Sequence, residues 1–200
     1  MDFFRRDVDT QSLTVSSYKT VATGLGVNFG LPVTEYDTVR LGLTAEQTEL
    51  TLDTTTSPPR YVDFVNQYGD ITSTLRTNIG YARDTRDSII YPTRGRFTDV
   101  GLEVGIPPGD LKYYRLNLQQ QFFYTPERVS WLTFLLNAEF GYADGYGGKP
   151  LPFFKNFYAG GVGSVRAYQT ASLGPRDIFG NTLGGNRRIV GGLEVLFPMP

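Results

Sequence analysis

A strict alternation of apolar and small polar positions runs along much of the chain. From Thr20 to Leu31, every second residue is threonine, valine, leucine or phenylalanine, and the residues between them are mostly glycine, alanine or asparagine. A period of two residues is typical of a β-strand whose two faces meet different surroundings. Pro32 has no amide hydrogen to donate to a neighbouring strand, so we expect it to end this strand.

The same alternation returns along the chain and predicts seven strands in total. Each is 10 to 14 residues long, which suits a tilted crossing of the ~30 Å hydrocarbon layer of a bilayer. Strands of soluble proteins are usually shorter, at about 5–6 residues. The expected strands are Thr20–Leu31, Val39–Leu52, Ile71–Arg83, Arg96–Ile106, Leu111–Tyr124, Ser130–Tyr142 and Arg188–Phe197.

The two faces of these strands differ in a way that separates a membrane barrel from a soluble one. A soluble β-sandwich or lipocalin-like barrel would turn the apolar face inward, against a packed core. Here the opposite face carries Arg40, Arg76, Glu103, Asn117 and Glu139, too many charges for a packed interior but normal for a wet lumen. We therefore predict an all-β fold, an antiparallel transmembrane β-barrel with the charged residues on the concave side. The residues expected to face lipid are Leu25, Val27, Leu41, Leu43, Ile79, Leu102, Leu116, Phe134, Leu136 and Leu193.

The connections between the strands predict an orientation. Outer-membrane barrels have short periplasmic turns and longer outside loops, so we place Asp53–Asp70 and Ala143–Arg187 outside. Seven strands cannot close a barrel, because an open edge in lipid leaves backbone hydrogen-bonding groups unpaired at several kcal/mol each. We therefore interpret residues 1–200 as an internal fragment of one larger outer-membrane barrel domain.

Composition excludes several kinds of chemistry. The chain has no cysteine and no histidine, so it cannot form thiol nucleophiles, Ser-His-Asp triads or zinc sites built on those residues. The formal net charge of −1 does not suggest a nucleic-acid partner. A wet lumen explains the carboxylates on the concave face without catalysis. We expect neither an enzyme nor a bound cofactor or metal.

One segment carries a recognisable motif. Lys155–Asp177 reads KNFYAGGVGSVRAYQTASLGPRD. It resembles the sixth extracellular loop of the BamA family of outer-membrane assembly factors, where Val-Arg-Gly-Phe/Tyr follows Phe-Tyr-x-Gly-Gly. The segments Tyr91–Gly95 and Gly141–Lys149 also resemble that family, and Ala167 stands where the family has glycine. The motif residues are Gly160, Gly161, Val165, Arg166, Ala167 and Tyr168.

The resemblance implies a larger protein than the chain itself. The expected strands would be the sixth to twelfth of about sixteen, an even strand number as in other single-chain bacterial barrels. POTRA domains and the terminal strands would lie outside the chain. The implied function is the folding and insertion of β-barrel proteins into the outer membrane. The implied partners are the lipid bilayer, nascent barrel proteins and the lipoproteins of an assembly complex. A related protein-translocation pore, of the two-partner-secretion type, is the alternative, and a diffusion porin would lack the Arg166 motif.

The resemblance also implies a role for Arg166. The loop would fold back into the lumen, with Arg166 against the barrel wall at Glu194, which occupies the family's acidic position on the following strand. Glu139 and Glu103 face the same side and are rival partners. We expect an arginine inside the lumen to keep little hydration, so that a charge-assisted hydrogen bond contributes about 1.5–3 kcal/mol. From the residues alone, a solvated cation in a flexible glycine-rich loop is an equally good interpretation.

Overall fold

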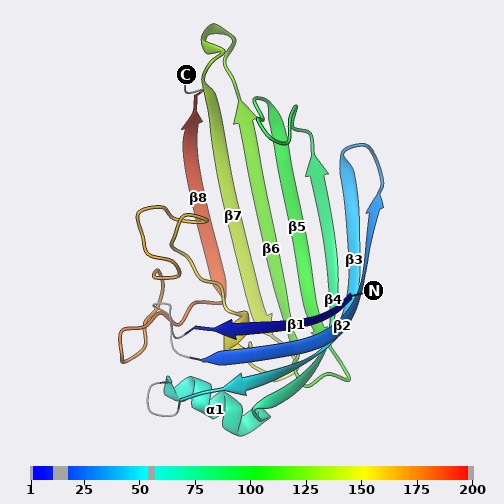
Figure 1. The fold of residues 1–200 in the computed structure, drawn as a ribbon, viewed down its shortest axis with the longest axis vertical. Helices are drawn as coiled ribbons and strands as arrows, with labels where there is room; N and C mark the ends of the chain where they lie inside the picture. The colour runs from blue at the N-terminus through cyan, green and yellow to red at the C-terminus, as the bar shows by residue number, and fades with distance from the viewer. Residues whose placement is uncertain (1, 11–17, 54–56, 198–200) are drawn as a thin grey trace.

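A computed structural model, which describes residues 2–10, 18–53 and 57–197, contains one antiparallel sheet of eight strands. The strands follow one another in chain order. Figure 1 shows the sheet curling, so that β1 and β2 run across the view while β5 to β8 run along its long axis. The strands are β1 (Asp2–Asp9), β2 (Lys19–Pro32), β3 (Asp37–Thr51), β4 (Ile71–Asp84), β5 (Gly95–Ile106), β6 (Tyr113–Tyr124), β7 (Thr133–Gly145) and β8 (Arg187–Leu196).

The all-β antiparallel prediction is confirmed, but it missed one strand. Residues 2–9 pair with β2 along their whole length, from Asp2 opposite Gly26 to Asp9 opposite Lys19. β1, rather than Thr20–Leu31, is therefore the first strand of the sheet. Its sequence, DFFRRDVD, places one phenylalanine and one arginine on each face, so the alternation that marks the other strands is absent.

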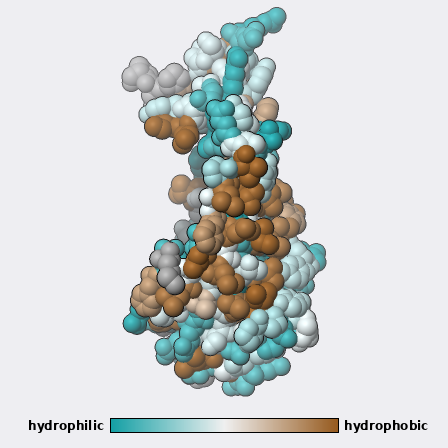
Figure 2. All heavy atoms as spheres, turned by 90° about the vertical axis from the view of Figure 1, so that its right-hand side faces the viewer, coloured by the Kyte–Doolittle hydropathy of each residue, from teal (hydrophilic) through white to brown (hydrophobic). Residues whose placement is uncertain are grey.

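The apolar face of the sheet points outward, as predicted. Leu25, Leu136 and Leu193 are exposed, which suits side chains that meet lipid rather than a protein core. Figure 2 shows hydrophobic side chains gathered mainly at mid-height of the molecule, with hydrophilic residues toward both ends. Register pairing aligns this band across strands, and one row from β2 to β7 contains Phe29, Leu41, Ile79, Leu102, Leu116 and Tyr142.

Each strand is antiparallel to the one before it in the chain, so alternate connections lie at the same end of the sheet. One end, called here the loop end, carries the connections 10–18, 52–70, 107–112 and 146–186, and the other, the turn end, carries 33–36, 85–94 and 125–132. The long connections thus share one end, as the predicted orientation requires. Within the described ranges, no helix has the length and apolar character needed to cross a bilayer.

The main apolar core lies at the loop end rather than inside the sheet. Tyr18, Tyr61, Phe64 and Phe153 are buried there, and the rings of Tyr61 and Phe153 stack with centroids 3.9 Å apart. Two of these aromatics come from helix α1 (Pro59–Tyr68), which the sequence analysis did not predict. The short 3₁₀-helices are η1 (Glu127–Val129) and η2 (Phe153–Lys155).

Candidate functional site

The long connection between β7 and β8, residues 146–186, is the candidate site, and we call it the docked loop. It folds on itself through three isolated bridges, which pair Phe157 with Gly185, Ala159 with Leu173, and Arg176 with Thr182. Its side chains contact residues of the charged, concave face of β3, β5 and β8, as described below. The motif is therefore presented by an ordered loop that lies against the sheet.

The paired glycines allow the tight backbone of the motif. Gly160 and Gly161 have φ angles of +111° and +96°, a region that side chains rarely adopt. A Cβ atom on Gly160 would lie 2.4 Å from the carbonyl oxygen of Gln169. The amide of Gly161 donates to the carbonyl of Tyr168 at 3.1 Å, which closes the turn around the motif.

The rest of the motif lies at the tip of the docked loop. Ala167 keeps a left-handed backbone, with φ of +71°, although it has a Cβ atom. The tight turn for which the family has glycine is thus retained here at the cost of some strain. Val165 is half-buried, and Tyr168 is exposed and contributes its carbonyl rather than its ring to the turn.

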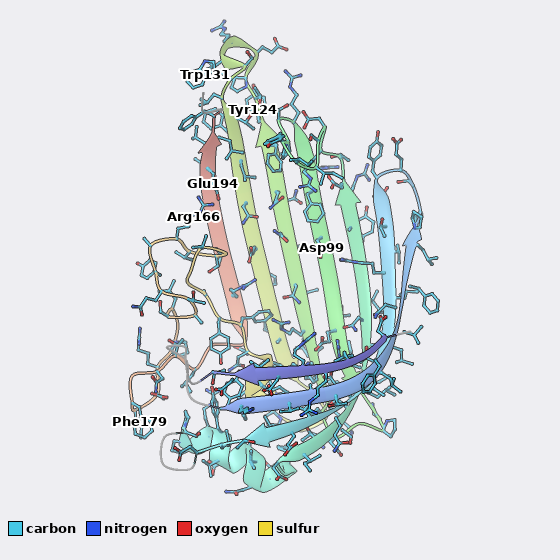
Figure 3. All side chains as sticks on the ribbon, viewed as in Figure 1. Asp99, Tyr124, Trp131, Arg166, Phe179 and Glu194 are labelled. Carbon is cyan, nitrogen blue, oxygen red and sulfur yellow. The ribbon has the colours of Figure 1, made fainter. Side chains whose placement is uncertain are left out.

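Arg166 reaches the wall of the sheet at Glu194. Its Nη2 atom donates to Oε2 of Glu194 at 3.2 Å, and Figure 3 shows the two side chains side by side, one from the loop and one from β8. The side chains are 67% and 33% exposed, respectively. Within residues 1–200, the arginine is therefore more hydrated than expected, and a pair exposed to this degree contributes about 0.2–1 kcal/mol rather than 1.5–3.

The two rival carboxylates bind other cations. Glu139 accepts a hydrogen bond from Nη2 of Arg188 at 2.7 Å. Glu103 accepts one from Lys155 at 2.9 Å and one from Arg76 at 3.1 Å. Arg166 therefore contacts Glu194 and neither rival.

A second contact between the loop and the wall involves Lys155, at the end of η2. Its Nζ atom lies 2.9 Å from Glu103 on β5 and 3.6 Å from Glu46 on β3. Arg76 on β4 joins the same two carboxylates, at 3.1 and 3.2 Å. All four side chains are at most 17% exposed. We call these four residues the base cluster, because they join the base of the docked loop to three neighbouring strands.

Phe157 packs the loop against β6, β7 and β8 on the same concave face. Its ring lies beneath the guanidinium groups of Arg115 and Arg188, whose carbon atoms are 4.3 and 5.7 Å from the ring centroid. Such contacts contribute about 0.5–2 kcal/mol, depending on solvent access. Gly141 on β7 makes room for the ring, because a Cβ atom there would lie 2.7 Å from it.

Sequence reasoning missed most of these anchors. Lys155 and Arg188 give no pattern of their own, because their partners lie 30 to 110 residues away in the chain and become neighbours only through strand register. Helix α1 could have been predicted from the sequence. Its apolar residues follow the 3.6-residue period, at Tyr61, Phe64, Val65 and Tyr68, and Pro59 suits a first helical turn. In the described part of the chain, no group of three or more acidic side chains could hold a metal ion.

Comparison with known proteins places these features in a family. Residues 1–200 match the family model of the Omp85 superfamily domain. The chain is 39% identical to the outer membrane protein assembly factor BamA of Neisseria meningitidis, over 94% of this chain and 25% of that protein. It is 30% identical to the human sorting and assembly machinery component 50 homolog, over 63% of this chain and 27% of that protein.

A solved structure shows the same fold. The structure of BamA from Haemophilus ducreyi lacking POTRA domains 1–3 matches 99% of this chain and 41% of its own, with a TM-score of 0.90 at 23% identity. The chain spans about a quarter of the length of the curated relatives named above. The predicted outer-membrane location and the predicted resemblance are confirmed by these bacterial relatives. The chain therefore belongs to the Omp85 superfamily.

Proposed function

We propose that the protein containing this chain folds β-barrel proteins and inserts them into the outer membrane. The relatives that match it are named as an outer membrane protein assembly factor and as components of a sorting and assembly machinery. The observation that carries the proposal is the docked loop, whose Arg166 contacts Glu194 on the wall. The activity is noncovalent and needs no cofactor. Its partners are the lipid bilayer, nascent barrel proteins and lipoproteins of an assembly complex.

The docked loop suits this activity because it ties distant strands together. The base cluster joins the loop to β3, β4 and β5, and Arg166 joins it to β8. Insertion of a client barrel requires part of the barrel wall to open in lipid, where unpaired backbone groups cost several kcal/mol each. A loop that spans the concave face keeps the curvature of the remaining strands while that opening occurs.

The test uses the full-length protein in a bacterium whose own assembly factor is depleted. Arg166→Ala should lower the amount of mature, heat-resistant porin trimer in the outer membrane. The charge reversal Arg166→Glu combined with Glu194→Arg should recover part of the loss, because the pair is direct. Arg176→Ala is the matched control, since the Arg176 side chain donates, among the residues that the structure describes, to carbonyl groups of its own loop, those of Gly180 and Ser172.

Two results would contradict the proposal. The first is an unchanged level of mature porin both with Arg166→Ala and with deletion of residues 160–172. The second is a selective loss of one exported soluble protein with normal porin levels, which would favour the related translocation pore.

A further inference from the structure

Two arginines at the turn end have no acidic partner. Arg94 ends the turn 85–94 and Arg128 lies in η1, and both are exposed. Among the residues that the structure describes, neither forms an ion pair with a carboxylate. They line a groove of about 560 Å³ together with Phe122, Tyr124 and Pro126. A basic groove with apolar walls is therefore open to a ligand at this end of the sheet.

The backbone that carries Arg94 is held in place. Asp87 accepts hydrogen bonds from the amides of Thr93 and Arg94, at 2.8 and 3.1 Å. The hydroxyl of Thr125, in the next turn along the sheet, donates to the carbonyl of Thr93 at 2.9 Å. The two turns are thus tied to each other, which fixes the spacing of the two arginine backbones before any ligand binds.

The surroundings of the groove suit a membrane boundary. Tyr124 and Trp131 are 53% and 60% exposed, and Figure 3 shows both near the top of the sheet. Tyrosine and tryptophan are enriched where the headgroups of a bilayer begin. Phe122 is exposed on the lipid-facing side, next to Leu136 and Leu193 in the register. An apolar path therefore leads from the lipid-facing band to the two arginines.

We propose that this groove binds the headgroup of an anionic glycerophospholipid from the leaflet at the turn end. Arg94 and Arg128 bind the phosphate, since a guanidinium group matches phosphate through two parallel hydrogen bonds. The acyl chains lie along Phe122 and Tyr124. Glu127 also lines the groove and opposes the anion, so that it weakens the binding. The apolar walls favour a lipid over free phosphate, and the inference stands independently of the assembly activity.

Native mass spectrometry of the full-length protein in detergent tests the proposal. Phosphatidylglycerol is titrated against phosphatidylcholine, and the bound lipid is counted. The double variant Arg94→Gln/Arg128→Gln should lose about thirtyfold in affinity for phosphatidylglycerol, because each basic residue near an anionic lipid surface contributes about a fivefold factor. Glu127→Gln should raise the affinity. Arg60→Gln, on α1 at the opposite end, is the matched control and should change nothing.

The outcomes separate the proposal from its alternatives. An unchanged affinity in the double variant overturns it, as does an equal loss in the control variant. Competition by inorganic phosphate at millimolar concentration would assign the groove to a free anion. Heat-dependent gel mobility establishes that every variant is folded, and if the double variant does not fold, Glu127→Gln still decides: no gain in affinity overturns the proposal.

Discussion

Replacing Lys155 by methionine is the sharpest test of how the docked loop is held. The substitution keeps the length of the side chain and removes its charge. In the native protein, the base cluster is balanced, with Lys155 and Arg76 against Glu46 and Glu103. Without Lys155, two poorly exposed carboxylates share one guanidinium group.

The size of the effect follows from burial and from the remaining partners. Removing one member of a buried ion pair costs about 3–5 kcal/mol, because the other charge stays buried. Lys155 and Glu103 are both 17% exposed, and Glu103 keeps Arg76 and accepts a hydrogen bond from the hydroxyl of Tyr113 at 2.5 Å. We therefore expect a cost at or just below the lower limit of this range, about 2–3 kcal/mol, in the free energy of opening the loop base. That change corresponds to roughly 30- to 150-fold in the opening equilibrium.

Amide hydrogen exchange measures this opening directly. The amides of Lys155, Asn156 and Phe157 donate to backbone carbonyls at 2.8 to 3.1 Å, so they exchange only when the base opens. Their exchange in the full-length protein should become faster by the factor given above. Lys155→Met combined with Glu103→Gln restores the charge balance and should reverse more than half of the change.

Lys19→Met is the control for the loss of a lysine as such. Lys19 also forms an ion pair, with Asp7 at 3.7 Å, but both side chains are about half exposed. An exposed pair contributes at most about 1 kcal/mol, so exchange at the loop base should not change. Exchange within twofold of the native rate in Lys155→Met, or an equal acceleration in Lys19→Met, would show that the base cluster does not anchor the loop.

Two further predictions concern the turns. Ala167→Gly should stabilise the closed loop tip by roughly 0.5–1 kcal/mol. The left-handed backbone at this position costs alanine about 1–2 kcal/mol, and glycine loses part of that gain through its greater freedom in the open state. Slower exchange of the Gly161 amide would support this prediction, and faster exchange would contradict it. The pKa of Asp87 is lowered to about 2 by hydrogen bonds from the Thr93 hydroxyl and from the amides of Thr93 and Arg94. The Asp87 carboxylate therefore contributes its full stability to the turn 85–94 above about pH 3.9, the pKa of aspartate in the unfolded chain. That contribution is lost as the pH falls toward 2. Cleavage of this turn by pepsin, corrected with a reference peptide, should accelerate over that interval in the native protein and stay constant in Asp87→Asn.

Much of the sheet follows from the sequence because its two faces meet such different surroundings. Where one face meets lipid and the other water, each strand needs a period of two, and a shift of one residue would reverse every side chain. β1 does not show this period of two, because two phenylalanines and then two arginines are adjacent in it, Phe3 and Phe4 followed by Arg5 and Arg6. Pairing with β2, rather than a local preference, makes residues 2–9 a strand.

Only part of the docked loop could be predicted from the sequence. The glycine pair and Arg166 could be found from the motif, because their spacing is local. The base cluster could not, since Lys155 meets Glu46 and Glu103 only after β3, β4 and β5 have paired in one register. The exposure of Arg166 could not be predicted either, because it depends on how far the loop tip stands from the wall.

The two anchors of the docked loop differ in strength, and this difference bears on how the loop can act. The exposed pair of Arg166 and Glu194 contributes about 1 kcal/mol at most, a bias of roughly fivefold toward the docked tip. The tip can therefore leave the wall often at ordinary temperature. The base, with its poorly exposed cluster and the aromatic core around Phe153, opens far more rarely. Under the proposed function, a client that competes for Glu194 would displace only the tip, while the base would stay joined to β3 and β5 through Lys155.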